Sequence, residues 1–368
     1  MALSRIHSRL LPKMGKYAGI DLPLTFSKFN IKDVVINTRR PDFTTVFDVS
    51  HMGVYEANIQ NNISEKLEKL LKTDVRGLKP NKAKLAVILN ENGEVQDDLI
   101  ISNVDNKKYR LVVNAGKNTT TFFDNFSSSL KRNEKSIIAL QGDGSQRLLE
   151  NIINEPLDSL YFMENKVLLD EKFEICRCGY TGEDGFELYL NNIEAEKIYE
   201  HLVSLAEQHE QSNTKVIFGG LIERDVLRTE AGLSLSGVEF SKDLEINFNS
   251  LNMPFLIDKK YRSSLSQSSF YQTLLSSDMP IKRGVIYGDS SQIDNCDENS
   301  VGFITSTVKS FNLNKFIGIG YINKNAAHHD MEEIPIFIKD RRNKRNYLKM
   351  HKNLINNKYF RKHNLKIK

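Results

Sequence analysis

The stretch Leu89–Ser102, LNENGEVQDDLIIS, places two neighbouring carboxylates, Asp97 and Asp98, directly before an aliphatic run. Aspartate is a poor strand former, yet the residues that follow are typical of a buried strand. Successive side chains of an extended segment point to opposite faces, so the two carboxylates cannot both serve one pocket. The one that faces inward is a candidate proton acceptor or hydrogen-bond anchor. The alternative is a pair of solvated aspartates close to a turn.

Two further segments combine polar side chains with glycines or apolar residues. They are FDVSHM over 47–52 and CGYTGEDGFEL over 178–188. The second segment lacks the GxGxxG spacing of a phosphate-binding loop and the alternating acids of a calcium loop. Its three glycines instead predict a tight turn that leads into a strand carrying Glu187.

The elements that would position these side chains are short and of both kinds. Apolar residues at helical spacing predict helices over 64–74, 143–154 and 194–210. The turn NENG separates two β-branched runs, so residues 84–104 are expected to form a β-hairpin that carries both aspartates. Strands that pair locally beside helices indicate an α+β fold.

A change of pattern near residue 263 predicts the domain organisation. Residues 263–280 are Ser-rich and weakly periodic, and we expect them to form a linker. Short strand-like runs separated by turns follow, which is the pattern of a small β-barrel or sandwich. The sequence therefore predicts a first region over 1–262 and a C-terminal domain over 281–368.

The composition excludes several classes of protein. The 368 residues are 40% apolar and 27% charged, as in ordinary globular proteins. No run approaches the roughly 20 apolar residues of a membrane helix, so we expect no membrane span. Three cysteines are too few for a disulfide framework and poor support for a metal site. A reducing compartment and no bound metal are the expectations.

Both ends of the chain are basic. No acidic residue precedes Asp21, and the Ser and Arg before it are typical of a mitochondrial transit peptide, with a first helix of the fold as the alternative. Residues 339–368 hold twelve lysines and arginines against one aspartate. Such a tail can attract an acidic partner or nucleic acid, or it can simply be solvated. Nucleic acid is disfavoured because no aromatic stacking platform accompanies the charge.

Six motifs occur in the order found in the aminomethyltransferases, the T-proteins of the glycine cleavage system. They are TVFDVSHMG, GEVQDDLII, YRLVVNAG, IALQGDGSQRLL, CGYTGEDGFEL and GLIERDVLRTEAGLSLSG. KYAGIDLPLTF resembles the opening segment of that family, and VGFITSTVKSFNLNKFIGIGYI resembles its C-terminal barrel. The resemblance implies a folate-binding region of two interleaved α+β lobes, followed by a small β-barrel.

The resemblance also implies the chemistry of the site. Asp98 matches the second aspartate of the family's pair, which is the catalytic one. Asn114 would lie against the folate, and Glu187 and Arg224 would bind the pterin ring and its neighbourhood. A pterin presents adjacent donors along a planar edge, and a carboxylate can accept two such hydrogen bonds at once.

Four more positions would line the same cavity. Met52 and Tyr180 match residues of the family's motifs. The family also carries a tryptophan that this chain lacks, and Phe255 is the best match for its ring. Tyr359 matches the tyrosine that normally closes the site. The altered segment over 238–262 marks a divergent member of the family.

The function implied by this resemblance is transfer of a lipoyl-bound aminomethyl group's methylene to tetrahydrofolate, with release of ammonia. Tetrahydrofolate would be the co-substrate, and the lipoyl carrier protein (H-protein) the partner. The mitochondrial matrix is the expected location, with the cytoplasm as the alternative. The competing function is a non-catalytic folate-binding scaffold, like the iron–sulfur assembly relatives of this fold. Those carry a KGCYxGQ motif, whereas CGYTGEDG here favours the transferase.

The basic tail gives a prediction about the partner. By family resemblance the carrier is acidic, so the tail should raise its association rate more than its final affinity. Changing Lys362, Lys366 and Lys368 to Gln should slow association measured by stopped flow at low salt. The difference should vanish at high salt, because the Debye length shortens from roughly 10 Å at 0.1 M to roughly 3 Å at 1 M. Equal rates for both proteins at low salt would show that the tail does not steer the carrier.

Overall fold

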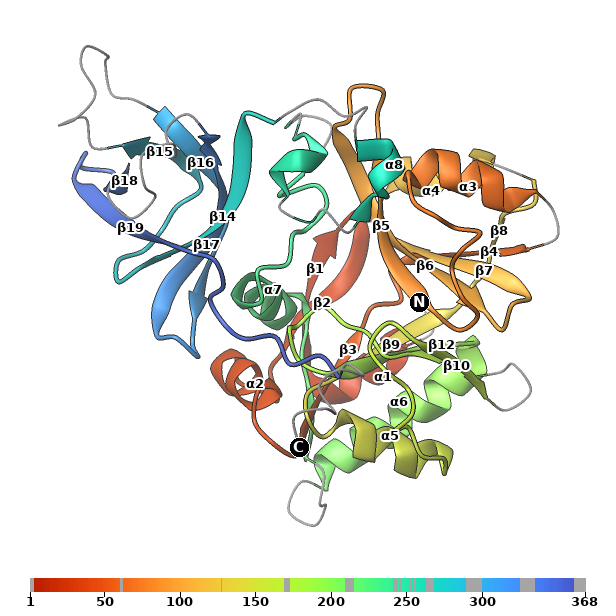
Figure 1. The fold of residues 1–368 in the computed structure, drawn as a ribbon. Helices are drawn as coiled ribbons and strands as arrows, with labels where there is room; N and C mark the ends of the chain where they lie inside the picture. Colours follow the sequence, from red (N-terminus) through yellow and green to blue (C-terminus); the bar gives the residue numbers. More distant parts are fainter. Residues whose placement is uncertain are drawn as a thin grey trace. The chain divides into compact units, whose positions relative to one another are not determined.

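A computed structural model of the protein describes residues 3–59, 62–126, 128–168, 173–208, 215–240, 244, 246–251, 253, 256–262, 268–288, 300–324 and 335–360 (Figure 1). By its internal contacts the chain divides into two compact units. The first comprises Met1–Ala86, Asp98–Leu227 and Asn357–Lys368, and the second comprises Val87–Asp97 and Arg228–Asn356. Each unit is therefore assembled from segments that lie far apart in the sequence.

The first unit contains a mixed sheet, here called the central sheet, with the strand order β10-β11-β12-β9-β3-β13. All neighbouring pairs are antiparallel except β13 with β3. Helices α5 and α6 pack on one face of it (Figure 1). The bounds are β3 Phe43–Asp48, β9 Ser136–Gln141, β10 Asn165–Leu168, β11 Phe173–Cys176, β12 Gly185–Leu190, β13 Lys215–Phe218, α5 Ser145–Ile153 and α6 Asn192–Glu207.

The two faces of the central sheet differ in chemistry. Every second residue of its strands joins one apolar core with the buried sides of α5 and α6. On the helix side these are Val46, Ile138, Leu140, Ile175, Phe186 and Leu188. The residues between them face the other way, and they include buried polar side chains, among them Glu174, Glu187 and Tyr189. A sheet buried on both faces, with polar groups on one of them, needs partners for those groups.

The second sheet has the strand order β5-β6-β7-β4-β8. β6 and β7 form a hairpin in register from Leu99 opposite Val113 to Val104 opposite Lys108. β4 pairs with the other edge of β7. The bounds are β4 Gly53–Asn58, β5 Ala83–Leu89, β6 Val95–Val104, β7 Lys108–Val113 and β8 Lys131–Arg132, with helices α3 Ile63–Leu71 and α4 Lys117–Phe126.

A buried ion pair joins the second sheet to the polar face of the central sheet. Arg110 of β7 is fully buried and donates from Nη1 to Glu174 Oε2 of β11 at 2.6 Å. It also donates from Nη2 to Asn165 Oδ1 of β10 at 2.6 Å. Lys108 and Lys135 contact the other Glu174 oxygen, at 2.9 and 2.5 Å. The polar face thus finds its partners on the facing sheet.

The N-terminal segment is part of the same unit. It forms α1 Ser4–His7 and the short 3₁₀ helix η1 Ser8–Leu10, and its apolar side chains join the core under the central sheet. These residues therefore form a first helix of the fold, and their role as a transit peptide stays a prediction. The remaining helices and strands between residues 1 and 230 are β1 Pro12–Tyr17, β2 Ile20–Phe26, α2 Ile31–Thr38 and α7 Leu221–Glu230.

The second unit contains a closed barrel with the strand order β14-β17-β16-β15-β18-β19. An apolar cluster that includes Leu275, Ile286 and Ile304 fills it. The bounds are β14 Phe270–Ser277, β15 Gly284–Gly288, β16 Ser300–Ser310, β17 Lys315–Asn323, β18 Ile336–Lys339 and β19 Arg345–His351, with η2 Phe248–Ser250 and α8 Lys259–Arg262.

The structure confirms the expected α+β fold with a C-terminal β-barrel, and it corrects the linker. Residues 270–277 form β14 rather than a linker, because Leu274 and Leu275 are buried and the serines near them only interrupt the pattern. The domain boundaries at 262 and 281 stay a prediction, since the contact units alternate along the chain. Within the described part of the chain, no helix is long and apolar enough to cross a membrane.

The Arg110–Glu174 pair gives a prediction for acid stability. Burial alone would raise the pKa of Glu174, but the charges of Arg110, Lys135 and Lys108 outweigh it and lower the pKa to about 2. A carboxyl group whose folded pKa is lowered stabilises the fold above its ordinary pKa of 4.5, and this stabilisation is lost as pH falls toward 2. Glu174→Gln should therefore lower the unfolding temperature at pH 7 and flatten its dependence on pH below 5.

The matched control is Glu65→Gln, because Glu65 forms an exposed pair with Lys69 on α3. Breaking a buried pair costs about 3–5 kcal/mol, whereas an exposed pair of this kind contributes little because water screens its charges. The measurement is thermal unfolding followed by circular dichroism at pH 7, 5 and 3. Parallel pH profiles for wild type and Glu174→Gln would contradict the expectation.

Candidate functional site

Asp98 and Asn114 meet at one end of the paired strands β6 and β7, and Met52 directly precedes the neighbouring strand β4. β6 pairs Leu99 with Val113, and β4 pairs Gly53 with the same valine, so each of the three residues is the next one along its segment. Asn114 Nδ2 donates to Asp98 Oδ1 at 2.6 Å and to the Asp98 backbone oxygen at 3.0 Å. All three side chains are half-buried. Asp98 and Asn114, from distant motifs, therefore meet at one end of these strands.

The neighbouring carboxylate, Asp97, points to the opposite face of β6. It is buried and accepts a hydrogen bond from Ser236 Oγ at 2.6 Å. Its partner therefore differs from that of Asp98, as strand alternation requires. The two neighbouring aspartates thus place one carboxylate on each face of β6. Asp98, which contacts Asn114, lies on the same face of the sheet as Arg110. Arg110 is four residues before Asn114 in the sequence, on the neighbouring strand β7.

Glu187 lies on the polar face of the central sheet. On β12 it stands opposite Cys176 of β11 on one side and Ala139 of β9 on the other. Both neighbours are small, and Glu187 itself is buried. Tyr189, two residues on, donates from its hydroxyl to Glu187 Oε2 at 2.7 Å. Because Arg110 joins this face to the second sheet, Glu187 and Asp98 belong to side-chain sets that face the same layer between the sheets.

Arg224 and Tyr180, two further predicted residues, contact each other. The guanidinium carbon of Arg224 on α7 lies 4.7 Å from the centroid of the Tyr180 ring, in the range of a cation–π contact. Arg224 also lines a small cavity. The other residues around this cavity are Leu22, Pro23, Phe26, Phe47, Asp48, Gly219, Gly220 and Leu221.

Three ionisable side chains, His51, Asp48 and Arg224, interact electrostatically near this cavity. Burial lowers the pKa of His51 to about 4, and the charge of Arg224 adds to this effect while Asp48 opposes it. His51 is therefore neutral at neutral pH. Asp48 is itself buried and pairs with His7 Nε2 at 3.1 Å. Among the described residues that line this cavity, Arg224 is the cationic one.

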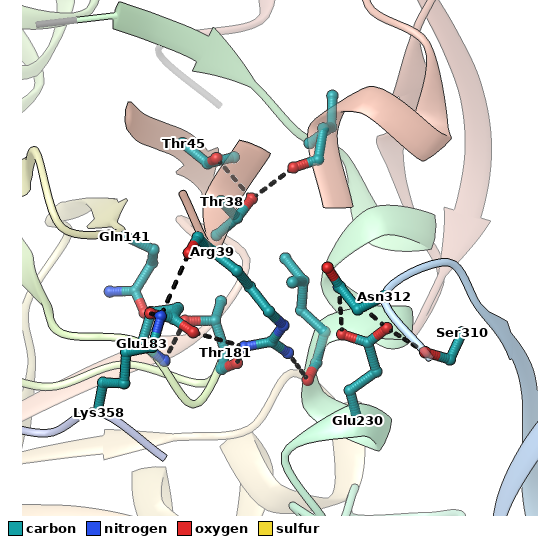
Figure 2. Close-up of polar contacts among 12 residues, drawn as sticks. Thr38, Arg39, Thr45, Gln141, Thr181, Glu183, Glu230, Ser310, Asn312 and Lys358 are labelled. Carbon is teal, nitrogen blue, oxygen red and sulfur yellow. Dashed lines mark hydrogen bonds and ion pairs between the residues drawn. The ribbon is translucent and has the colours of Figure 1, made fainter. Parts of the chain in front are cut away.

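The loop that carries Tyr180 is held by buried polar contacts. Figure 2 shows Glu183 between Arg39 and Lys358, with distances of 2.9 and 3.2 Å to their nitrogens. Thr181 Oγ1 donates to Gln141 Oε1 at 2.8 Å. Because Arg39 follows α2 and Lys358 belongs to the C-terminal segment, this loop is tied to both. We infer that Tyr180 is presented from a rigid support.

Tyr359 lies beside this loop because the preceding residue, Lys358, is hydrogen-bonded to it. Lys358 N donates to Gly182 O at 2.8 Å, and the Tyr359 ring stacks on Phe162 with centroids 4.2 Å apart. Phe255, the expected stand-in for the family's tryptophan, lies outside the described residues. Among the residues that the structure describes, no group of three or more His, Cys, Asp or Glu could hold a metal ion.

Comparison with known proteins identifies the family. The sequence model described as the GCVT N-terminal domain matches residues 3–260. The chain belongs to this family. The aminomethyltransferase of Oceanobacillus iheyensis is 32% identical over 331 residues, covering 83% of this chain and 85% of that protein. The mitochondrial aminomethyltransferase of Pisum sativum is 33% identical over 359 residues, covering 90% and 83%.

A solved structure is similar over nearly the whole chain. The glycine cleavage system aminomethyltransferase T from Bartonella henselae covers 98% of this chain and 99% of its own, with a TM-score of 0.83 and 25% identity. The resemblance seen in the motifs is therefore confirmed, and so is the fold of the GCVT family. The relatives include bacterial proteins and plant proteins named as mitochondrial, so neither of the two expected locations is selected.

Sequence reasoning missed several residues that support this site. Arg110 lies within the motif YRLVVNAG and Tyr189 directly follows the motif CGYTGEDGFEL, yet their residue types alone do not show which sheet each side chain faces. Asp48 and His7 are 41 positions apart in the sequence. Charged residues at alternate positions of an otherwise apolar strand could have indicated these contacts, because a buried charge needs a buried partner.

Proposed function

We propose that this GCVT-family chain is the aminomethyltransferase of a glycine cleavage system. It transfers the methylene of a lipoyl-bound aminomethyl group to tetrahydrofolate, releases ammonia and forms methylene-tetrahydrofolate. The observation that carries the proposal is the placement of Asp98 with Asn114 on one sheet and Glu187 on the facing sheet, in a chain whose relatives are named aminomethyltransferases.

The reaction needs little covalent chemistry from the protein. Two folate nitrogens form bonds to the methylene carbon, while the bonds from that carbon to the carrier sulfur and to the amine nitrogen break. The two protons that leave the folate nitrogens go to the sulfur and to the departing ammonia. The protein's role is to hold the reactants in position and to accept a proton transiently.

Each predicted residue has a part in this proposal. Asp98 holds the folate or accepts its proton, and the Asn114 amide fixes the orientation of that carboxylate. Glu187 binds the donor edge of the pterin, and the side chains of Ala139 and Cys176 beside it are small. Arg224 lies at the cavity wall against Tyr180.

The remaining assignments belong to the same proposal. Met52 directly precedes β4, the strand that pairs with β7, and Tyr359 packs beside the loop of Tyr180. Phe255 is retained from the family match alone. The partner is a lipoyl carrier protein, which brings the aminomethyl group. A mitochondrial location is supported by the plant relatives, and the cytoplasmic alternative by the bacterial ones. The comparisons do not favour the alternative of a non-catalytic scaffold.

The first test concerns the two aspartates. Asp98→Asn keeps the size of the side chain and still offers an oxygen to Asn114, but it removes charge and basicity. Aminomethyl transfer should fall about 100-fold or more, with the unfolding temperature little changed. Asp97→Asn should change the rate much less, because Asp97 faces Ser236 on the other side of β6. Equal rate losses in the two variants, measured as methylene-tetrahydrofolate formed with loaded carrier, would refute the assignment.

The second test concerns folate affinity. Glu187→Ala and Arg224→Ala should each weaken tetrahydrofolate binding about ten- to a hundred-fold, because a lost hydrogen bond to a charged group costs about 1.5–3 kcal/mol. Calorimetric titration of the full chain measures this. Glu196→Ala is the matched control, since Glu196 is an exposed glutamate on α6. Unchanged affinity in both site variants would remove Glu187 and Arg224 from the folate site.

A further inference from the structure

Two buried glutamates on the polar face of the central sheet receive different partners. Glu174 meets the cations Arg110, Lys108 and Lys135. Glu187, on the neighbouring strand, receives a hydroxyl from Tyr189 at 2.7 Å. A cation neutralises a carboxylate, whereas a neutral hydroxyl orients it and leaves its negative charge in place. The two sites are therefore built for different purposes.

The direction of the Tyr189 hydrogen bond is fixed by its surroundings. Tyr189 is buried, and burial raises its pKa well above the ordinary value, with the nearby charge of Glu187 adding to the effect. The phenol therefore keeps its proton and donates it to Glu187 Oε2. Residues 187 and 189 are two apart on β12, so their side chains share one face and the contact costs no distortion of the strand.

The Tyr189 ring is itself held in place by Arg110. The guanidinium carbon of Arg110 lies 3.8 Å from the ring centroid, which is a stacked cation–π contact. Arg110 in turn is fixed by Glu174 and Asn165, each at 2.6 Å. The phenol is thus clamped between β12 and β7, and its hydroxyl has one defined position.

Small side chains lie beside the carboxylate on its own rung. On the rung of Glu187 the central sheet carries Cys176, Ala139 and then Phe47, since β9 pairs Ala139 with both Glu187 and Phe47. Phe47 also lines the cavity beside Arg224. A ligand that reaches Glu187 along this rung would meet a carboxylate whose far oxygen is already occupied by a fixed donor.

We propose that Tyr189, clamped by Arg110, is a positioning residue that orients the Glu187 carboxylate toward the N–H donors of the pterin. The inference rests on the proposed function, in which Glu187 binds the folate. It assigns Tyr189 an action through Glu187, so its removal changes substrate binding rather than the chemical step.

The main variant is Tyr189→Phe, which keeps the ring under Arg110 and removes only the hydroxyl. The dissociation constant and KM for tetrahydrofolate should each rise about two- to tenfold, as expected for loss of one net hydrogen bond. The value of kcat should change less than about twofold. Arg110→Lys keeps the charge but loses the planar guanidinium, so it should weaken binding in the same direction.

The matched control is Tyr109→Phe. Tyr109 is the residue before Arg110 on β7 and is also buried, but it faces the other side, where its hydroxyl donates to Val75 O at 3.3 Å. This variant removes a buried phenol hydroxyl without touching Glu187. A KM increase as large in Tyr109→Phe as in Tyr189→Phe would overturn the proposal, and so would unchanged binding in Tyr189→Phe.

A double-mutant cycle tests whether Tyr189 acts through Glu187. In the background of Glu187→Gln, Tyr189→Phe should cause at most a small further loss of tetrahydrofolate affinity, because the group that it orients has lost its charge. Fully additive losses would assign the two residues independent roles and overturn the proposal. Calorimetry with tetrahydrofolate on the full chain supplies the four dissociation constants.

A measurement without ligand separates this proposal from the proposed function. The carboxyl carbon resonance of Glu187, assigned by its absence in Glu187→Gln, is followed by ¹³C NMR at fixed pH. Tyr189→Phe should shift it and Tyr109→Phe should not, and an unmoved resonance overturns the positioning role. Wild-type protein that fails to bind tetrahydrofolate would instead overturn the proposed function, with the resonance still deciding whether Tyr189 orients Glu187.

Discussion

The contact on which the layer between the two sheets depends is the buried ion pair of Arg110 with Glu174. Both side chains are almost fully inaccessible, so each would carry a large desolvation cost without the other. Because Arg110 belongs to β7 and Glu174 to β11, the pair fixes the position of one sheet against the other. It also sets the place of the Tyr189 ring, and through it the surroundings of Glu187.

The polar face of the central sheet carries two buried glutamates, of which one stabilises the fold and the other is proposed to bind the substrate. Glu174 is surrounded by cations that lower its pKa to about 2 despite burial, so it is committed to holding the fold. Glu187 receives a neutral hydroxyl instead, and its rung neighbours are small.

The register of the antiparallel strands brings together residues from motifs that are distant in the sequence. Asp98 and Asn114 come from different motifs of the chain, yet the register of β6 against β7 brings them into a hydrogen bond. Met52, from a third motif, directly precedes the strand that pairs with the other edge of β7. The same rule places Glu187 in line with Phe47 through Ala139. A one-residue slip in any of these strands would turn its side chain to the wrong face, so the strand register itself is part of the site.

The sequence by itself determined the α+β character, the barrel, the hairpin that carries DD and the opposite orientation of Asp97 and Asp98. These follow from local periodicity, which each segment carries within itself. Only the tertiary structure decided that residues 270–277 form β14, that Arg110 partners Glu174, and that Tyr189 supports Glu187. Arg110 and Glu174 lie 64 positions apart, and whether they meet depends on which sheet faces which, a property that no single segment encodes.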